Sequence, residues 1–261
     1  MESKRLSKQE KKKLKYEKVR ESRKKQRKRL RDAQKEKRRE MLAAMTDEQR
    51  AEFVKKEREE KNLLETEYLR ASQQGTPIVV DFSHSQMMSE QEQTSLVSQI
   101  RQATGFLRKR SNQFYQLLCC SVPPSIKEQY LKYASEKWMV KIKDTDLEGI
   151  EEIAHKNVIM LSPDSADPLG ELDLENSVYV IGGIVDRTIK SQITLEQAMK
   201  KNLTARRLPI QEEFGSNVKF VLNVNTVIEL LQIKAEGRTW RETFLEGIPK
   251  RYLKQRGIIP E

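Results

Sequence analysis

Two carboxylates and a pair of glycines stand directly after apolar segments of this sequence, where an open parallel sheet binds its ligands. Asp81 ends one apolar segment, and Gly182 and Gly183 follow another, with Asp186 three residues later. Glycines after a buried strand let the backbone come close to a ligand or to another chain segment. A tight turn followed by a surface acid gives the same pattern, so spacing alone leaves the role of these residues open.

Several common cofactor and metal motifs are missing from the sequence. No G-x-G-x-x-G follows the first apolar segment and no P-loop occurs, so a dinucleotide or nucleoside triphosphate site is unsupported. The two histidines, His84 and His155, occur without a C-x-x-C, so we expect no metal site. We interpret His84 as a loop residue and His155 as the end of a helix. Cys119 and Cys120 are adjacent, which excludes a disulfide scaffold and fits a reducing compartment.

The elements that position these residues alternate between strand and helix. We expect strands at 77–82, 114–119, 138–142, 158–161 and 178–181, with shorter strand-like pieces at 207–210 and 219–222. We expect helices at 89–109, 123–135, 146–155, 194–201, 225–235 and 240–246, with Ser89 and Thr194 as N-cap residues. Short apolar runs separated by helices predict βαβ units and a parallel α/β sheet.

The positive charge of the chain is concentrated at its N-terminal end. The 261 residues carry a net charge of +11, yet residues 1–40 contain 20 Lys and Arg against 7 Asp and Glu, a net of +13. Gly and Pro are absent from 1–74, and the good helix formers Lys, Arg, Glu, Gln and Ala dominate. We therefore expect residues 1–70 to be a long solvated helix, or an arm that becomes helical when it binds RNA. The polar run 72–77 marks the domain boundary.

Counterion release from phosphates would drive RNA binding by this arm. The candidate RNA contacts are Lys24, Lys25, Arg27, Lys28 and Arg29, together with Arg108, Lys109 and Arg110. A solubilising tail or a nuclear-import signal would explain the same charge. No segment approaches the roughly 18–20 apolar residues of a membrane span, and residues 1–30 lack an apolar signal region, so neither membrane insertion nor secretion is expected.

Five motifs resemble, in the same order, those of the eukaryotic and archaeal tRNA position-9 purine N1-methyltransferases, a family of the SPOUT class. They are IVVDFS at 78–83, LSPDS at 161–165, VYVIGGIVD at 178–186, ARRLPI at 205–210 and VLNVNTV at 221–227. The resemblance covers about 77–250, which is then the methyltransferase domain, with 251–261 as a C-terminal tail. The basic arm is similar to the N-terminal extension of the family.

The resemblance implies a SPOUT α/β domain with a parallel sheet and a C-terminal trefoil knot that binds S-adenosylmethionine. It further implies a monomer that binds tRNA in the nucleus, the cytoplasm or both. The cofactor contacts that it implies are Leu161, Ser162, Gly182, Gly183, Arg187, Thr188, Lys190, Leu208, Leu222, Asn223 and Asn225. Relatives often carry polar residues such as Asn after the aspartate, so Arg187 and Lys190 could contact RNA phosphate instead.

Asp186 matches the proposed general base of the family. Guanine N1 carries a proton that it must lose as the methyl group arrives, and a carboxylate can accept that proton. Adenine N1 has a free lone pair, so Asp186 favours guanosine without excluding adenosine, and it could also serve mainly to position the target. Reaching a base inside the tRNA requires local unstacking or flipping. The alternatives are a non-catalytic tRNA-binding protein and a subunit of an RNA-processing complex, each with a degenerate SPOUT domain.

Overall fold

The computed structural model describes residues 7–132, 138–185, 192–218 and 220–260. The chain divides into two compact units, Met1–Lys61 and Asn62–Glu261. Helix α1 (Lys8–Ala43) belongs to the first unit, and helix α2 (Asp47–Gln74) begins there and continues into the second. The described part of the arm is therefore helical.

The turn between α1 and α2 is held by side chains of the first unit. Arg50 donates from Nε to the carbonyl of Leu42 at 2.9 Å, and the amide of Arg50 donates to the carbonyl of Thr46 at 2.9 Å. Arg38 of α1 forms a bidentate ion pair with Glu57 of α2. These contacts close the turn with polar groups, since apolar side chains are sparse along α1.

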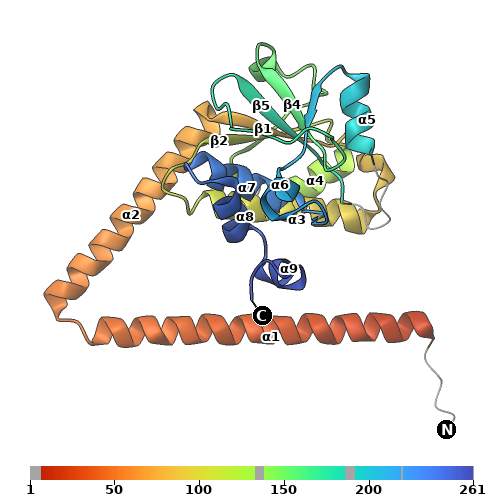
Figure 1. Ribbon diagram of the computed structural model, residues 1–261. Helices are drawn as coiled ribbons and strands as arrows, with labels where there is room; N and C mark the ends of the chain where they lie inside the picture. Colours follow the sequence, from red (N-terminus) through yellow and green to blue (C-terminus); the bar gives the residue numbers. More distant parts are fainter. Residues whose placement is uncertain (1–6, 133–137, 186–191, 219, 261) are drawn as a thin grey trace, which may run out of the picture. The chain divides into compact units, whose positions relative to one another are not determined.

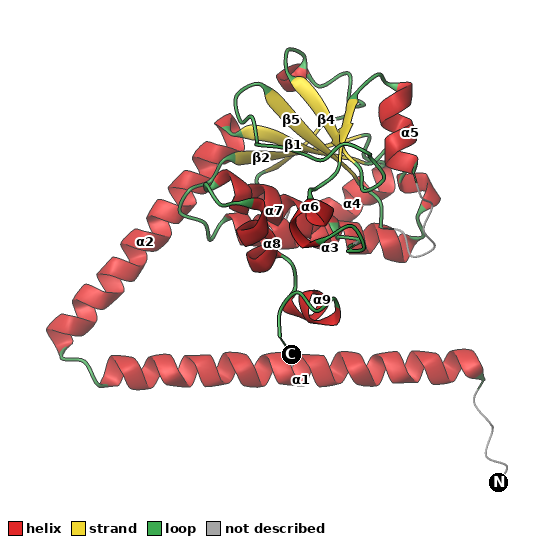
Figure 2. Cartoon of the chain, viewed as in Figure 1, coloured by secondary structure: helices red, strands yellow, loops and turns green. Residues whose placement is uncertain are grey.

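The second unit contains a fully parallel sheet with the strand order β3-β2-β1-β5-β4-β6. Figure 2 labels β1, β2, β4 and β5 of this sheet. The strands are β1 (Thr76–Asp81), β2 (Tyr115–Cys120), β3 (Val140–Ile142), β4 (Asn157–Leu161), β5 (Ser177–Gly182) and β6 (Thr204–Arg206). Their register brings the strand ends together, because Asp81 is paired with Gly182 and Leu161 is paired with both Ile181 and Arg206. The predicted α/β fold with a parallel sheet is confirmed.

Helices cover both faces of this sheet (Figure 1). Ile78 and Val80 of β1 point into the larger core, whereas Val79 between them points into the smaller one, as the two-residue period of a strand requires. The larger core is closed by α3 (Glu90–Leu107), α4 (Pro124–Lys132), α6 (Ile210–Phe214), α7 (Val224–Ala235), α8 (Trp240–Gly247) and α9 (Lys250–Gln255). The smaller core is closed by α5 (Ile193–Lys200) and the 3-10 helix η3 (Glu151–Ile153).

The last turns of α2 pack into the larger core of the second unit. Tyr68 and Ala71 are buried, and the Tyr68 hydroxyl donates to the carbonyl of Trp138. Arg108, just after α3, forms an ion pair with Glu65 at 2.6 Å, and its guanidinium lies over the Tyr68 ring. The end of α2 is thereby fixed before β1 begins.

The predicted start of α3 is confirmed, and other predictions need correction. Ser89 caps α3 in a capping box with Glu92. Thr194 is not an N-cap residue, because α5 begins at Ile193 after Gln192 and Thr194 lies in the first turn. The helix predicted at 146–155 is reduced to η3, since the Asp146 carboxylate accepts from the amide of Gly149 at 3.0 Å and forms a turn instead.

The two C-terminal strand predictions are wrong in position. A strand was expected at 207–210, but the strand in this region, β6, ends at Arg206. Helix α6 begins at Ile210, directly after Pro209. Proline lacks the N–H that a central strand needs, and it suits the start of a helix. Residues 220–222 form no strand, and Lys219 lies outside the described residues.

Candidate active site

Three loops meet at the carboxyl edge of the sheet, beyond β4, β5 and β6. The register places Leu161 between Ile181 of β5 and Arg206 of β6, so the residues that follow these strands are neighbours. Leu161, Ile181 and Val224 belong to one buried cluster, and the half-buried Leu208 packs against it. The structure therefore brings together the strand ends on which the cofactor contacts were predicted.

The loop after β4 is tied to β6 through backbone and hydroxyl groups. Ser162 is buried, and its amide donates to the carbonyl of Arg206 at 2.9 Å. Ser165 is also buried, and its hydroxyl donates to the carbonyl of Ala205 at 3.0 Å. The Ser162 hydroxyl accepts from the amide of Asp164 at 3.4 Å. Serines in this loop thus satisfy backbone groups that would otherwise lie unpaired at the end of the sheet.

The glycines after β5 allow close approach of other parts of the chain. The amide of Gly183 donates to the carbonyl of Asp81 at 2.8 Å, and a Cβ on Gly183 would lie only 2.9 Å from that oxygen. A Cβ on Gly182 would meet Cγ2 of Thr194 at 3.1 Å. Both glycines therefore pack closely against other segments of the chain, Gly183 against β1 and Gly182 against Thr194 of α5.

The start of α7 carries the remaining predicted cofactor contacts that the structure describes, Leu222, Asn223 and Asn225. The amide of Val224 donates to Oε1 of the buried Gln99 of α3 at 2.9 Å, which fixes this helix end. Asn223 is exposed and has no side-chain capping bond. The side-chain Nδ2 of Asn225 donates to Oε1 of Glu229 at 3.1 Å, and burial raises the pKa of the Glu229 carboxyl. Leu222 is half-buried and packs against the larger core.

The predicted general base Asp186 and the predicted contacts Arg187, Thr188 and Lys190 lie outside the described residues. The chain on either side of them is fixed. Before them, the amide of Val185 contacts the sulfur of Met88 at 3.2 Å. After them, the amide of Gln192 donates to Oδ2 of Asp164, in the loop after β4, at 2.8 Å.

A buried polar network, which the sequence did not indicate, lies between β1 and α5. The carboxylate of Asp81, 2% exposed, accepts from Nε2 of Gln197 at 2.6 Å and from the amide of Ser83 at 2.9 Å. Oε1 of Gln197 also lies 3.1 Å from Nε2 of His84. His84 lies in the turn after β1, which agrees with its interpretation as a loop residue. Asp81 thus bonds to α5 through its side chain and to Gly183 through its carbonyl.

The predicted RNA contacts after α3 separate into two kinds. Arg108 is bound to Glu65, and Arg110 forms ion pairs with Glu236 and Glu246. Both arginines therefore hold helices of the second unit together, and their pairing with carboxylates raises the pKa of each guanidinium. Lys109, between these two arginines, is exposed, and its contact with RNA stays a prediction.

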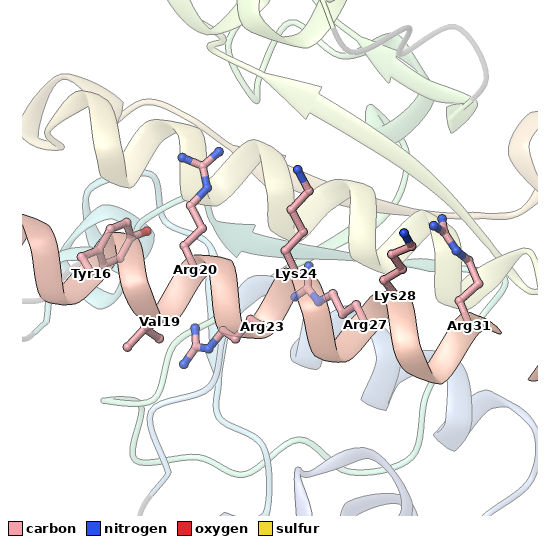
Figure 3. Close-up of a pocket in the computed structure, with 8 residues that line it drawn as sticks. All are labelled: Tyr16, Val19, Arg20, Arg23, Lys24, Arg27, Lys28 and Arg31. Atoms are coloured by element: carbon pink, nitrogen blue, oxygen red, sulfur yellow. The ribbon is translucent and has the colours of Figure 1, made fainter. Parts of the chain in front are cut away.

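The predicted RNA contacts on α1 are all exposed, but they do not share one face. Lys24, Arg27 and Lys28 line an open pocket that runs along one side of the helix, whereas Lys25 and Arg29 are not among its lining residues (Figure 3).

Among the described residues, no group of three or more His, Cys, Asp and Glu could hold a metal ion. No described helix is both long enough and apolar enough to cross a membrane.

The family model described as tRNA (guanine(9)-N(1))-methyltransferase TRM10/TRM10A matches residues 2–253. The chain belongs to the TRM10/TRM10A family. The resemblance drawn from the five motifs is thereby confirmed.

Named relatives in this family cover most of the chain. The tRNA methyltransferase 10 homolog B of Rattus norvegicus is 30% identical over 207 residues, which are 76% of this chain and 65% of that protein. The tRNA (guanine(9)-N1)-methyltransferase of Kluyveromyces lactis is 26% identical over 186 residues, which are 71% of this chain and 62% of that protein. The chain thus spans slightly less than two thirds of the length of these relatives.

Solved structures of TRM10 proteins share the fold. The full-length spTrm10 complex with SAH matches with a TM-score of 0.58 at 25% identity, over 67% of this chain and 96% of that chain. A dual-specific Trm10 from Thermococcus kodakaraensis matches with a TM-score of 0.51 at 20% identity, over 65% of this chain and 97% of that chain, a likeness of fold alone.

Proposed function

We propose that this chain is a methyltransferase that uses S-adenosylmethionine to methylate N1 of guanosine at position 9 of tRNA. The observation that carries this proposal is the meeting of Leu161, Gly183 and Leu208 at the ends of neighbouring strands, within a chain of the TRM10/TRM10A family. Relatives from Kluyveromyces lactis and Schizosaccharomyces pombe are named tRNA (guanine(9)-N1)-methyltransferase. A Trm10 relative is solved with SAH.

The residues at this edge fit an adenosyl group. Leu208 and Leu222 are half-buried apolar side chains that pack against one core, which suits contact with a flat base. The exposed Asn223 and the backbone of the fixed loop after Leu161 offer polar groups for ring nitrogens and ribose hydroxyls. When bound, S-adenosylmethionine supplies an electrophilic methyl group on a sulfonium.

The proposed role of Asp186 is to accept the proton of guanine N1 as that nitrogen gains the methyl group. The aspartate follows Gly183 by three residues, and Gly183 is fixed to Asp81. Proton acceptance by a positioned side chain typically contributes about 10²–10⁴-fold to a rate. Arg187 and Lys190 are then candidates for contacts to either the cofactor or the RNA phosphates.

The trefoil knot, the monomeric state and a nuclear or cytoplasmic location belong to the same proposal. Support for the knot comes from the family and from the return of the chain after β5 to a strand that pairs with β4. The monomeric state and the location rest on the resemblance to the family.

The test combines calorimetry with single-turnover methylation by the wild type and by Asp186→Asn. We expect the wild type to bind S-adenosylmethionine and to methylate a tRNA transcript. We expect Asp186→Asn to bind both ligands with a rate reduced about 10²–10⁴-fold. A variant with unchanged rates at all pH values would contradict the base role. A wild type that binds tRNA and fails to bind S-adenosylmethionine would establish the non-catalytic alternative.

A further inference from the structure

One face of α1 carries a continuous row of cations. The pocket along this face is lined by Tyr16, Val19, Arg20, Arg23, Lys24, Arg27, Lys28 and Arg31. These positions alternate in steps of three and one, so they follow one side of a helix with 3.6 residues per turn. Arg20, Lys24 and Arg31 project from the same side of α1 (Figure 3). Six of the eight lining residues are Arg or Lys.

The acids of the same stretch, Glu17, Glu21 and Asp32, are not among the lining residues. Each of them lies three or four residues from a cation of the face: Glu17 from Arg20, Glu21 from Lys24 and Asp32 from Lys28. The ion pairs of the described N-terminal unit, Arg38–Glu57, Arg50–Asp47 and Lys55–Glu59, leave this face untouched. The six cations of the face are thus exposed, and none of these ion pairs uses one of them.

This arrangement is unfavourable for the helix by itself. Each of the six cations has a like-charged neighbour three or four residues away, and such pairs destabilise isolated helices by about 0.2–0.5 kcal/mol each. Lys25 and Arg29, on the other side, are also like-charged neighbours, four residues apart. Because six cations share the pocket face, a polyanion bound there relieves more repulsion than one bound on the side of Lys25 and Arg29.

The dimensions and composition of the face favour RNA over an anionic membrane. Arg20 and Arg31 are eleven residues apart, about 16 Å at 1.5 Å per residue, which spans several phosphates. A helix lying on a membrane presents a broad apolar face opposite its charges, and the opposite side of α1 carries Lys18, Lys25 and Arg29. Tyr16, 71% exposed at one end of the face, offers an aromatic ring on which an unpaired base can stack.

We propose, on the basis of the proposed tRNA methyltransferase function, that this face alone of α1 receives the tRNA. Arg20, Lys24 and their neighbours on the face bind consecutive phosphates, and Tyr16 stacks on an unpaired base beside them. Lys25 and Arg29, on the opposite side, make no phosphate contact.

Two triple variants of the full chain test the choice of face. Lys24→Gln/Arg27→Gln/Lys28→Gln removes three cations from the face, and Lys18→Gln/Lys25→Gln/Arg29→Gln removes three from the opposite side, so both lower the net charge equally. Dissociation constants for a tRNA transcript are measured at several salt concentrations, with circular dichroism as the check on helix content. A third arm uses vesicles that contain phosphatidylserine.

We expect the face variant to reduce the slope of log K against log salt by about 2–3, with a loss of affinity of about tenfold or more at moderate salt. The opposite-side variant should keep the wild-type slope within about one unit. Equal losses in the two variants would overturn the face assignment, as would equal binding of the wild type to vesicles and to tRNA. Tyr16→Ala should weaken binding about fivefold or more without changing the slope, and Tyr16→Phe should restore it; an unchanged Tyr16→Ala would refute the stacking.

The inference and the proposed function fail in different experiments. A wild type that methylates tRNA while both triple variants lose affinity equally refutes only the face assignment. A wild type that shows the face dependence and does not bind S-adenosylmethionine refutes only the proposed enzymatic function.

Discussion

Replacement of Gly183 by alanine tests how the candidate active site is held together. A Cβ at this position would lie 2.9 Å from the carbonyl oxygen of Asp81 and 3.2 Å from Cγ1 of Val80. The nearer atom is backbone of a strand paired on both sides, so the end of β5 must move away from β1. Overpacking of this kind typically costs about 1–3 kcal/mol.

The displacement also weakens the hydrogen bond from the Gly183 amide to Asp81, which is 2.8 Å long and contributes about 0.5–1.5 kcal/mol. We therefore expect Gly183→Ala to lower the free energy of unfolding by about 2–4 kcal/mol. At about 2–4 °C per kcal/mol for a unit of this size, the Tm should fall by about 5–15 °C. Affinity for S-adenosylmethionine should fall as well, because the loop after β5 is displaced.

The assay is urea unfolding followed by circular dichroism, with calorimetry of the cofactor at a temperature where the variant is folded. Gly170→Ala is the matched control, since nothing lies within 4 Å of a Cβ at Gly170 and its φ is not in the left-handed region. We expect that control to be neutral or more stable by up to about 1 kcal/mol. A Gly183→Ala protein as stable as Gly170→Ala, with unchanged cofactor affinity, would refute the packing explanation.

Two further predictions concern buried and paired side chains. Gln197→Leu removes a hydrogen-bond donor from the buried carboxylate of Asp81, so it should lower the free energy of unfolding in urea by about 1–3 kcal/mol. The control Glu196→Gln, on the exposed side of α5, should change this free energy little. Equal effects of the two substitutions would contradict the role of the network. The hydrogen bond from Lys143 holds the pKa of Glu152 below its usual 4.5, so the ionised form stabilises the fold above that pH and loses this effect as pH falls through the lowered pKa. Wild type should therefore exceed Glu152→Gln in stability at neutral pH, and the difference should shrink in unfolding experiments below about pH 4.5; a difference independent of pH would contradict the ion pair.

Local signals in the sequence specified many elements of the fold. Ser89 followed by Glu92 is a capping box that is visible in the sequence, and α3 begins there. The apolar runs that became β1 and β5 are each bounded by a turn residue, and their strands begin within one residue of the predicted position. The turn at Asp146 was misread as a helix because its carboxylate competes for the backbone amide of Gly149.

Other features depend on the pairing of distant segments. Asp81 and Gln197 are 116 residues apart in sequence and meet only because α5 packs beside the end of β1. Arg108 and Arg110 look like a basic patch in the sequence, but their partners are Glu65 of α2 and Glu236, which directly follows α7. The division of α1 into two faces follows from residue spacing that is present in the sequence, although consecutive runs such as Lys24-Lys25 conceal it.

The most direct test of the proposed function is to map methylated nucleosides after the purified protein acts on tRNA with S-adenosylmethionine. Two transcripts are compared that differ only in carrying guanosine or uridine at position 9, and the digested nucleosides are separated and identified by mass spectrometry. We predict 1-methylguanosine at position 9 of the first transcript and no methylation of the second. Absence of methyl transfer to the guanosine transcript, by folded protein that binds the tRNA, would contradict the assignment of this chain as a tRNA methyltransferase.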